Sequence, residues 1–211
     1  TSVFSPLFSA NLGLDIYFEG REQDRNATNM LGLAASQQVN KNIRLKWMFS
    51  RFENDESENY DIIGSYLFGE RDFDRSKPTF GLIVNPLGAG VYHQFARNQL
   101  NIVNWAASHK GQWVKNKQFM QWGLTLEKTL IKDNLNEWER LDSAGYTLPL
   151  IPGRLPLSKV LKSSADLDIN KISGYIQDNI VVNDAQGITL QAGLRFNFNG
   201  LNKEFLLSPR L

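Results

Sequence analysis

The sequence predicts an all-β protein built from amphipathic antiparallel strands, and three observations lead to this class. Residues 188–198 (ITLQAGLRFNF) place apolar and polar side chains at alternate positions, and successive side chains of a strand point to opposite faces of the sheet. Similar segments of about ten residues, close to the roughly 9–11 that a tilted strand needs to cross a bilayer, recur along the chain. The connectors between them roughly alternate in length.

Composition narrows the class further. The 211-residue chain has a formal net charge of +1, so nothing points to a nucleic-acid partner, and it has no cysteine for a disulfide scaffold or a thiolate metal site. No apolar run approaches the roughly 18 residues of a membrane-spanning helix. A mean hydropathy of −0.34 is compatible with a membrane β-barrel, because polar interior side chains alternate with the lipid-facing ones.

The predicted strands follow from this alternation. In residues 43–52, for example, Ile43 and Trp47 share one face while Arg44 and Lys46 share the other, and these charged side chains need a wet side. The full set comprises residues 10–19, 29–35, 43–52, 61–70, 79–85, 99–110, 117–127, 171–182, 188–198 and a strand beginning at 204.

The connectors predict the topology. Short turns are expected at residues 36–42, 71–78, 111–116 and 183–187. Longer or more charged connectors are expected at residues 20–28, 53–60, 86–98 and 128–169. The last of these holds three prolines, which are excluded from central strands, and its residues 135–141 (LNEWERL) are compatible with a helical turn. Alternating short and long connectors are typical of outer-membrane barrels, with short periplasmic turns and long outer loops.

We therefore expect an antiparallel transmembrane β-barrel of which residues 1–211 form a part, with about nine to ten strands and a long outer loop at 128–169. We expect an internal piece of a longer barrel, without a plug, a signal peptide or a closing strand. Aromatic residues near the loop-side ends of three strands predict an outer aromatic girdle, although aromatics also simply favour strands. These residues are Phe18, Phe49, Phe52, Phe196 and Phe198.

Several segments resemble one family. The run GYIQD (174–178), LQAGLR (190–195) and LSPR (207–210) is similar to a run in the barrels of TonB-dependent outer-membrane receptors. Upstream, LKWMFSRFENDESENYD, YLFGERDFD, NPLG and WERLDSAGY resemble the Bacteroidetes branch of that family. The resemblance covers most of the chain, and its C-terminal run is the most specific part.

The resemblance implies a 22-stranded barrel with an N-terminal plug, in the outer membrane of a Gram-negative bacterium. It implies active uptake of a large or scarce nutrient, driven by the TonB–ExbB–ExbD complex through the plug. A surface lipoprotein of the SusD type accompanies some branches of the family. No cofactor or metal is implied, and the partners would be these proteins and outer-membrane lipid rather than nucleic acid.

Candidate site residues divide into two groups. The alternation places a first group toward the barrel interior, where they would line a wet path or contact a plug. These are Arg44, Lys46, Gln121, Thr125, Glu127, Gln177, Gln191 and Arg195. Trp138 and Tyr146, in the long outer loop, are candidates for contact with an incoming solute as stacking platforms, or for packing that loop.

Catalysis and metal binding have weaker signals. His93, in a predicted loop without a carboxylate nearby in sequence, and His109, beside a predicted turn, do not indicate a protease or lipase, so we expect no enzyme activity. The acidic segment 53–61 offers oxygen ligands for calcium but lacks the spacing of a dedicated loop. A complete small barrel with rim hydrolase activity and a soluble all-β binding module remain the competing functions.

Overall fold

All regular structure in the described residues, 3–5, 8–154, 156–183 and 185–210 of the computed structural model, is β-strand. The strands are β1 (Val3–Ser5), β2 (Phe8–Gln38), β3 (Ile43–Arg71), β4 (Ile83–Lys115), β5 (Gln118–Asp142), β6 (Lys159–Asn183), β7 (Ile188–Asn199) and β8 (Glu204–Arg210). The prediction of an all-β protein is therefore confirmed.

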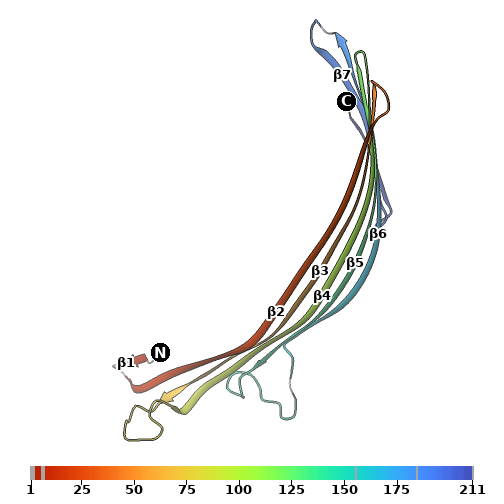
Figure 1. Cartoon of the computed structure of the whole chain (residues 1–211). Helices are drawn as coiled ribbons and strands as arrows, with labels where there is room; N and C mark the ends of the chain where they lie inside the picture. The colour runs from red at the N-terminus through yellow and green to blue at the C-terminus, as the bar shows by residue number, and fades with distance from the viewer. Residues whose placement is uncertain (1–2, 6–7, 155, 184, 211) are drawn as a thin grey trace. The chain divides into compact units, whose positions relative to one another are not determined.

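The strands form one eight-stranded sheet in chain order, from β1 to β8 (Figure 1). Neighbours are antiparallel, as connections too short for a crossover require. The order ends at β1 and β8, which do not pair with each other among the described residues, so this sheet is open.

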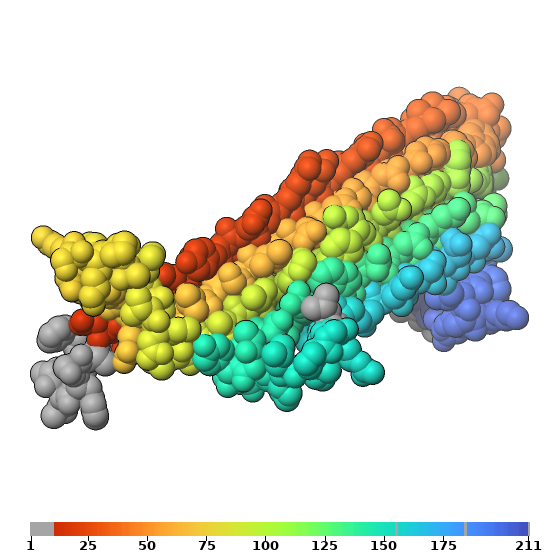
Figure 2. Space-filling model, turned by 90° about the horizontal axis from the view of Figure 1, so that it is seen from below, coloured from red at the N-terminus to blue at the C-terminus, as the bar shows by residue number. Residues whose placement is uncertain are grey.

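The chain divides into two compact units, through both of which β2 to β6 pass. Unit 1 comprises residues 1–25, 57–99 and 134–164, and unit 2 comprises residues 26–56, 100–133 and 165–211. Unit 2 contains the tight turns 39–42 and 116–117 and the turn that ends at Gly187, whereas unit 1 contains the long connections 72–82 and 143–158. Within each unit the strands lie side by side in chain order (Figures 1 and 2).

The strands are much longer than predicted. β2, β3 and β4 contain 31, 29 and 33 residues, and β5 and β6 contain 25 each, so eight strands, five of them long, replace the nine to ten short ones. The expected connectors 20–28, 53–60 and 86–98 lie inside β2, β3 and β4, and residues 135–141 extend β5 rather than form a helical turn. Residues 79–82 belong to the 72–82 connection, so the predicted 71–78 turn lies in a long loop and the predicted 128–169 loop shrinks to 143–158.

Polar pairing across strands explains the extra length. Thr28 donates a hydrogen bond to the Asn54 side chain at 2.8 Å, and the amide of Asn101 donates to Asp55 at 2.8 Å. The hydrogen bonds between strands use only backbone N–H and C=O groups, whatever the side chains are. A polar segment can therefore continue a strand when its side chains form hydrogen bonds with those of the neighbouring strand. The loss of hydrophobic alternation therefore did not mark a strand end.

The sheet has almost no core. Among the described residues, the buried apolar side chains are only those of Ala96 and Ile169. The accessible surface is 15217 Å², whereas a compact globular protein of this mass exposes roughly 10,000 Å². Both faces of the sheet are thus available to whatever surrounds the protein.

Glycines receive the largest rings of neighbouring strands. In unit 2, a Cβ built on Gly111 would overlap the indole of Trp122, and a Cβ built on Gly123 would overlap the ring of Tyr175. These contacts cross from β4 to β5 and from β5 to β6. The two glycines are therefore required by close approach, and they fix which way the rings lean.

The 72–82 connection in unit 1 is organised by two carboxylates. Asp72 accepts hydrogen bonds from the Asp74 N–H and the Thr79 hydroxyl, and Asp74 accepts from the backbone and hydroxyl of Ser76. The Lys77 ammonium lies 3.8 Å from Asp72 and 3.7 Å from Asp74. These hydrogen bonds, led by Thr79 for Asp72 and by Ser76 for Asp74, lower the pKa of both carboxyls.

We expect Gly111→Ala to lower the free energy of unfolding by about 1–3 kcal/mol, because the new methyl group forces the Trp122 ring out of its rotamer. Gly32→Ala is the matched control, since a Cβ there meets nothing within 4 Å. Denaturant titration followed by tryptophan fluorescence measures both variants. Equal stability of the two would contradict the packing described.

The 72–82 connection should lose order in acid. Because the folded pKa of each carboxyl lies below the ordinary value of 3.8, its contribution is present above that pH and is lost as the pH falls through the folded pKa. The amide resonances of Asp74 and Ser76 should shift in this acid range, and Asp72→Asn should remove the part of the Asp74 amide shift that follows protonation of Asp72. Amide resonances unchanged by acid would refute the arrangement.

Candidate functional site

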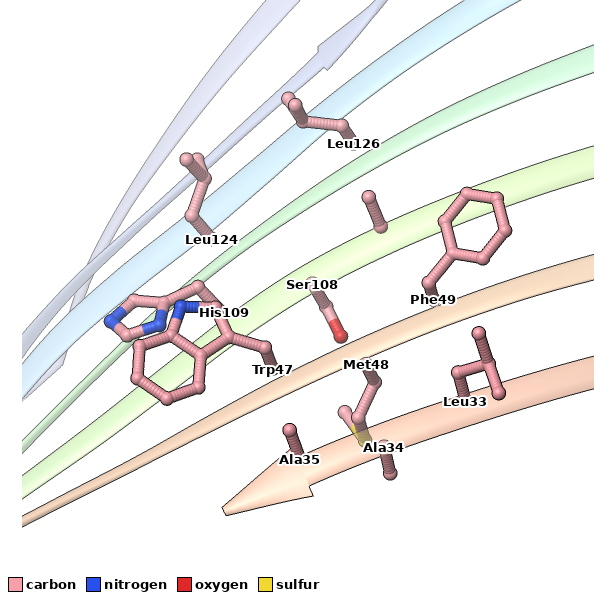
Figure 3. A pocket seen from close by; sticks show the side chains of 11 residues that line it. Leu33, Ala34, Ala35, Trp47, Met48, Phe49, Ser108, His109, Leu124 and Leu126 are labelled. Carbon is pink, nitrogen blue, oxygen red and sulfur yellow. The ribbon is translucent and has the colours of Figure 1, made fainter. Parts of the chain in front are cut away.

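One face of unit 2 is apolar and carries a shallow hollow of about 450 Å³ (Figure 3). We call this surface the apolar face. Its hollow is lined chiefly by Leu33, Ala35, Trp47, Phe49, Ala107, His109, Leu124 and Leu126, from β2, β3, β4 and β5. Side chains at alternate positions of a strand point the same way, so the mostly apolar residues at these positions of neighbouring strands together build one continuous apolar surface.

Aromatic rings pack across this face. The rings of Trp47 and His109 lie 5.4 Å apart and side by side in Figure 3, and the indole N–H of Trp122 donates to His109 Nε2 at 3.2 Å. Trp105 packs against Phe49 at 5.7 Å, and the guanidinium of Arg51 lies 5.1 Å above its indole. Charged groups therefore begin where the apolar residues of β3 end.

On β7 the predicted alternation holds. Leu190 and Leu194 are 53% and 42% exposed, and Phe196 packs against Phe205 of β8 with ring centroids 6.3 Å apart. Arg195 lies opposite Tyr175 of β6 in the register, one position away from Leu194 and thus on the other side of the strand. Leu190 and Leu194 are not packed in a protein core, and contact with lipid stays a prediction.

The other face of unit 2, which we call the polar face, has two adjoining hollows on β4 to β8. The first, of about 330 Å³, is lined by the side chains of Lys110, Thr125, Ser173, Tyr175, Gln177, Arg195 and Arg210. The second, of about 390 Å³, has Glu127, Lys171, Arg195, Asn197 and Glu204 among its lining residues. Thr125, Ser173 and Arg195 line both hollows.

The predicted interior-facing residues separate in the structure. Thr125, Gln177 and Arg195 line the first hollow, and Glu127 joins Thr125 and Arg195 in the second. The remaining four do not line either hollow: Arg44, Lys46, Gln121 and Gln191. Arg44 donates instead to the Gln38 side chain at 3.0 Å, across the 39–42 turn.

Unit 1 has its own apolar hollow, of about 730 Å³, which the sequence did not indicate. Its lining includes Leu14, Ile16, Tyr66, Tyr92, Leu141 and Leu148. The alternation in residues 10–19 and 61–70 predicted the strands that carry Leu14, Ile16 and Tyr66 of this lining. The other half lies in segments predicted as loops, so Tyr92 and Leu141 were not assigned to a strand face.

The two candidate solute contacts have different surroundings. Trp138 lies in β5, not in an outer loop, and its ring stacks on Phe95 at 5.1 Å with an angle of 10°. Tyr146 does lie in the 143–158 connection, where its hydroxyl donates to the Pro86 carbonyl at 3.2 Å and its side chain is half exposed. Trp138 is thus part of cross-strand packing.

His93 pairs with the carboxylate of Asp61, which lies 32 residues earlier in the chain and was therefore not identified as its partner from the sequence. It lies in β4 rather than in a loop, its Nε2 is 2.6 Å from an Asp61 oxygen, and its ring meets the edge of Trp138 at 4.7 Å. The Asp61–His93 pair joins β3 to β4 on the side of the sheet where Trp138 packs. The contacts of His93 in the described residues are a carboxylate and an aromatic ring on the neighbouring strands, so it contributes to cross-strand packing.

The acidic segment 53–61 is strand, so its carboxylates do not form a loop around a metal ion. Asp55 and Glu58 bond to different amides, those of Asn101 and Asn98. Among the described residues, no three His, Cys, Asp or Glu side chains cluster as metal ligands would. Residues 53–61, which the sequence predicted as an acidic loop, are therefore part of β3.

A polar cluster in unit 1 surrounds Asn98, which is only 7% exposed. Its amide donates to Glu58 at 3.1 Å and Glu137 at 2.7 Å, and its carbonyl oxygen accepts from the Asn136 N–H at 3.1 Å. Burial and then the carboxylates of Glu137 and Glu58 raise the pKa of nearby Tyr60. These residues come from three strands, and no local sequence pattern marks them.

We expect Asn98→Ala to destabilise unit 1 by about 1–3 kcal/mol at neutral pH, because two carboxylates lose the donor between them. Asn101→Ala, which removes an exposed amide with one partner, is the control and should cost less. Thermal unfolding of the two variants at pH 7 gives the comparison. An Asn98→Ala variant as stable as the control would show that the cluster is not stabilising.

No helix among the described residues is long and apolar enough to cross a membrane. Comparison with known proteins finds no family model that matches the chain and no curated protein with a matching sequence.

Proposed function

We propose that unit 2 forms part of the wall of an outer-membrane β-barrel, with the apolar face toward lipid and the polar face toward the interior. The observation that carries the proposal is the exposed apolar face itself. Its leucines and aromatics lie on a single-layer sheet with no protein layer over them in the described residues. Exposed contiguous apolar surface of this kind marks contact with a membrane or with another protein.

The dimensions support a membrane as the medium. Leu190 and Phe198 share the apolar side of β7 and are separated by about 26 Å along the strand, at about 3.3 Å per residue. For a barrel strand tilted by about 35–45°, this length corresponds to about 20 Å of height, which is most of the apolar band. An outer-membrane barrel has an apolar band about 25 Å tall, flanked by aromatic residues at its interfaces. Trp105, with Arg51 above its ring, is placed as an interfacial aromatic residue would be.

The proposal further assigns the protein to a TonB-dependent receptor that imports a large or scarce nutrient. The three pieces of the C-terminal run that resembles this family lie on adjacent strands, β6, β7 and β8. The register pairs Tyr175 with Arg195, Gln177 with Gly193, and Gly193 with Arg210. Residues separated in the sequence run therefore form one patch of the sheet, which supports their similarity as a structural unit.

This function implies partners outside the chain. A plug would occupy the interior and transmit force from TonB, ExbB and ExbD, and a SusD-type lipoprotein is a further candidate at the outer surface. In lipid, the outer edge of β8 and the part of β2 beyond its pairing with β1 would also pair with further strands, because unsatisfied backbone groups are costly there. The polar residues Glu127 and Arg195 would then face the interior.

Hydrolysis at the barrel rim has no comparable support. The described contacts of His93 are Asp61 and Trp138, and those of His109 are two indole rings. Neither histidine is hydrogen-bonded to a serine or threonine hydroxyl among the described residues. A soluble binding module would need another protein surface to cover the apolar face, and the following measurement distinguishes the two media.

Spin labels placed singly at residues 190 to 197, in protein reconstituted into bilayers, should alternate in accessibility. Labels at 190, 194 and 196 should be reached by oxygen, which partitions into lipid, while labels at 191, 195 and 197 should be reached by a water-soluble nickel reagent. Each even position has its odd neighbour as the matched control. Uniform accessibility, or folding in water as a monomer without detergent, would refute the membrane proposal.

A further inference from the structure

The first hollow of the polar face is centred on a glycine. Gly193 of β7 lies opposite Gln177 of β6 and Arg210 of β8, and Arg195 follows two positions along the same face of β7. The missing side chain at Gly193 leaves a space among these three long side chains. A Cβ built there would lie 3.4 Å from the Ile176 carbonyl, an ordinary contact, so the backbone itself does not require glycine.

Tyr175 keeps this space open from the other side. Its ring leans from β6 toward β5, where it lies over Gly123. It therefore leans away from Arg195, its direct partner on β7. The hydroxyl-bearing ring forms one wall of the hollow, and the guanidinium of Arg195 is left uncovered by its cross-strand neighbour.

All charged residues that line the first hollow are positively charged. Its lining holds the cations Lys110, Arg195 and Arg210 and no carboxylate. Among the described residues, neither arginine has a hydrogen bond or ion pair to another side chain. The adjoining hollow differs, because its lining holds the carboxylates Glu127 and Glu204 beside the cations Lys171 and Arg195.

We propose that this hollow binds an anionic group, a carboxylate or phosphate of a small solute, bridged by Arg195 and Arg210 over Gly193. The two arginines sit diagonally on neighbouring strands, at a Cα separation of roughly 7–8 Å that both long side chains can span to reach one anion. The planar guanidinium matches the two oxygens of such a group, and Gln177 and Tyr175 supply neutral donors.

The size of the hollow fits a small ligand. Its volume of about 330 Å³ lies at the lower end of the roughly 300–1,000 Å³ of small-molecule sites. The site is defined by the register of β6, β7 and β8 and by two glycines, so it stands whichever medium covers the apolar face. It goes beyond the proposed transport role, since it names the charge of a bound solute.

Isothermal titration of the folded 211-residue chain with inorganic pyrophosphate and with citrate tests the site, with glucose as the neutral probe. Arg195→Gln and Arg210→Gln should each weaken anion binding about tenfold or more, since each removes charge-assisted hydrogen bonds. Gly193→Leu should weaken it as strongly although every charge remains. Lys41→Gln, in the 39–42 turn, removes one exposed positive charge elsewhere and should bind like the wild type.

The pattern across variants decides the outcome. Tighter binding of pyrophosphate than citrate would identify phosphate as the preferred source of the anion, and the reverse would identify carboxylate. Arg195→Lys, which keeps the charge without the fork, should show an intermediate loss and confirms that folding is intact. Absence of anion binding, loss equal in Lys41→Gln and Arg195→Gln, or unchanged binding by Gly193→Leu would overturn the proposal.

Discussion

The constraint on which the structure depends is that a single-layer sheet has no interior. Only the backbone ladder and side-chain contacts between neighbouring strands hold the described strands together, because the hydrophobic core that stabilises a soluble domain is nearly absent. The stabilising contacts are therefore lateral: Trp122 on Gly111, Tyr175 on Gly123, and Trp138 on Phe95. Each face must be stabilised by what lies outside it, so the chemistry of each face indicates its surroundings.

The polarity of the faces differs between the units. In unit 2, the apolar positions of β3 are odd-numbered, as with Leu45, Trp47 and Phe49. In unit 1, the even-numbered positions of β3 carry the larger apolar groups, and Tyr66 lines the hollow there. A strand that is longer than a bilayer is thick would pass through lipid along one part and through water along another. With 29 residues, β3 is long enough for this.

Sequence alternation predicted strand identity well where one face is apolar and failed where both are polar. Residues 188–198 were placed almost to the residue, since β7 runs from Ile188 to Asn199. Residues 53–60 were misread as a connector because Asp55 and Glu58 carry no apolar alternation, although Asn101 and Asn98 satisfy them across the sheet. Such pairs join residues about 40 positions apart, and one sequence contains no signal for that register.

The anion site was not predicted for the same reason, because one sequence contains no signal for the register that forms it. The site also suggests a structural role for the C-terminal run. Tyr175 and Gln177 of GYIQD, Gly193 and Arg195 of LQAGLR, and Arg210 of LSPR all line one hollow. Along the chain they are merely polar residues with a glycine among them. The register places Gly193 between Gln177 and Arg210, so the missing side chain leaves a space between them. It also brings Arg195 and Arg210 close enough to bind one anion together. The motif is therefore better understood as the lining of a site than as a signature of strand formation.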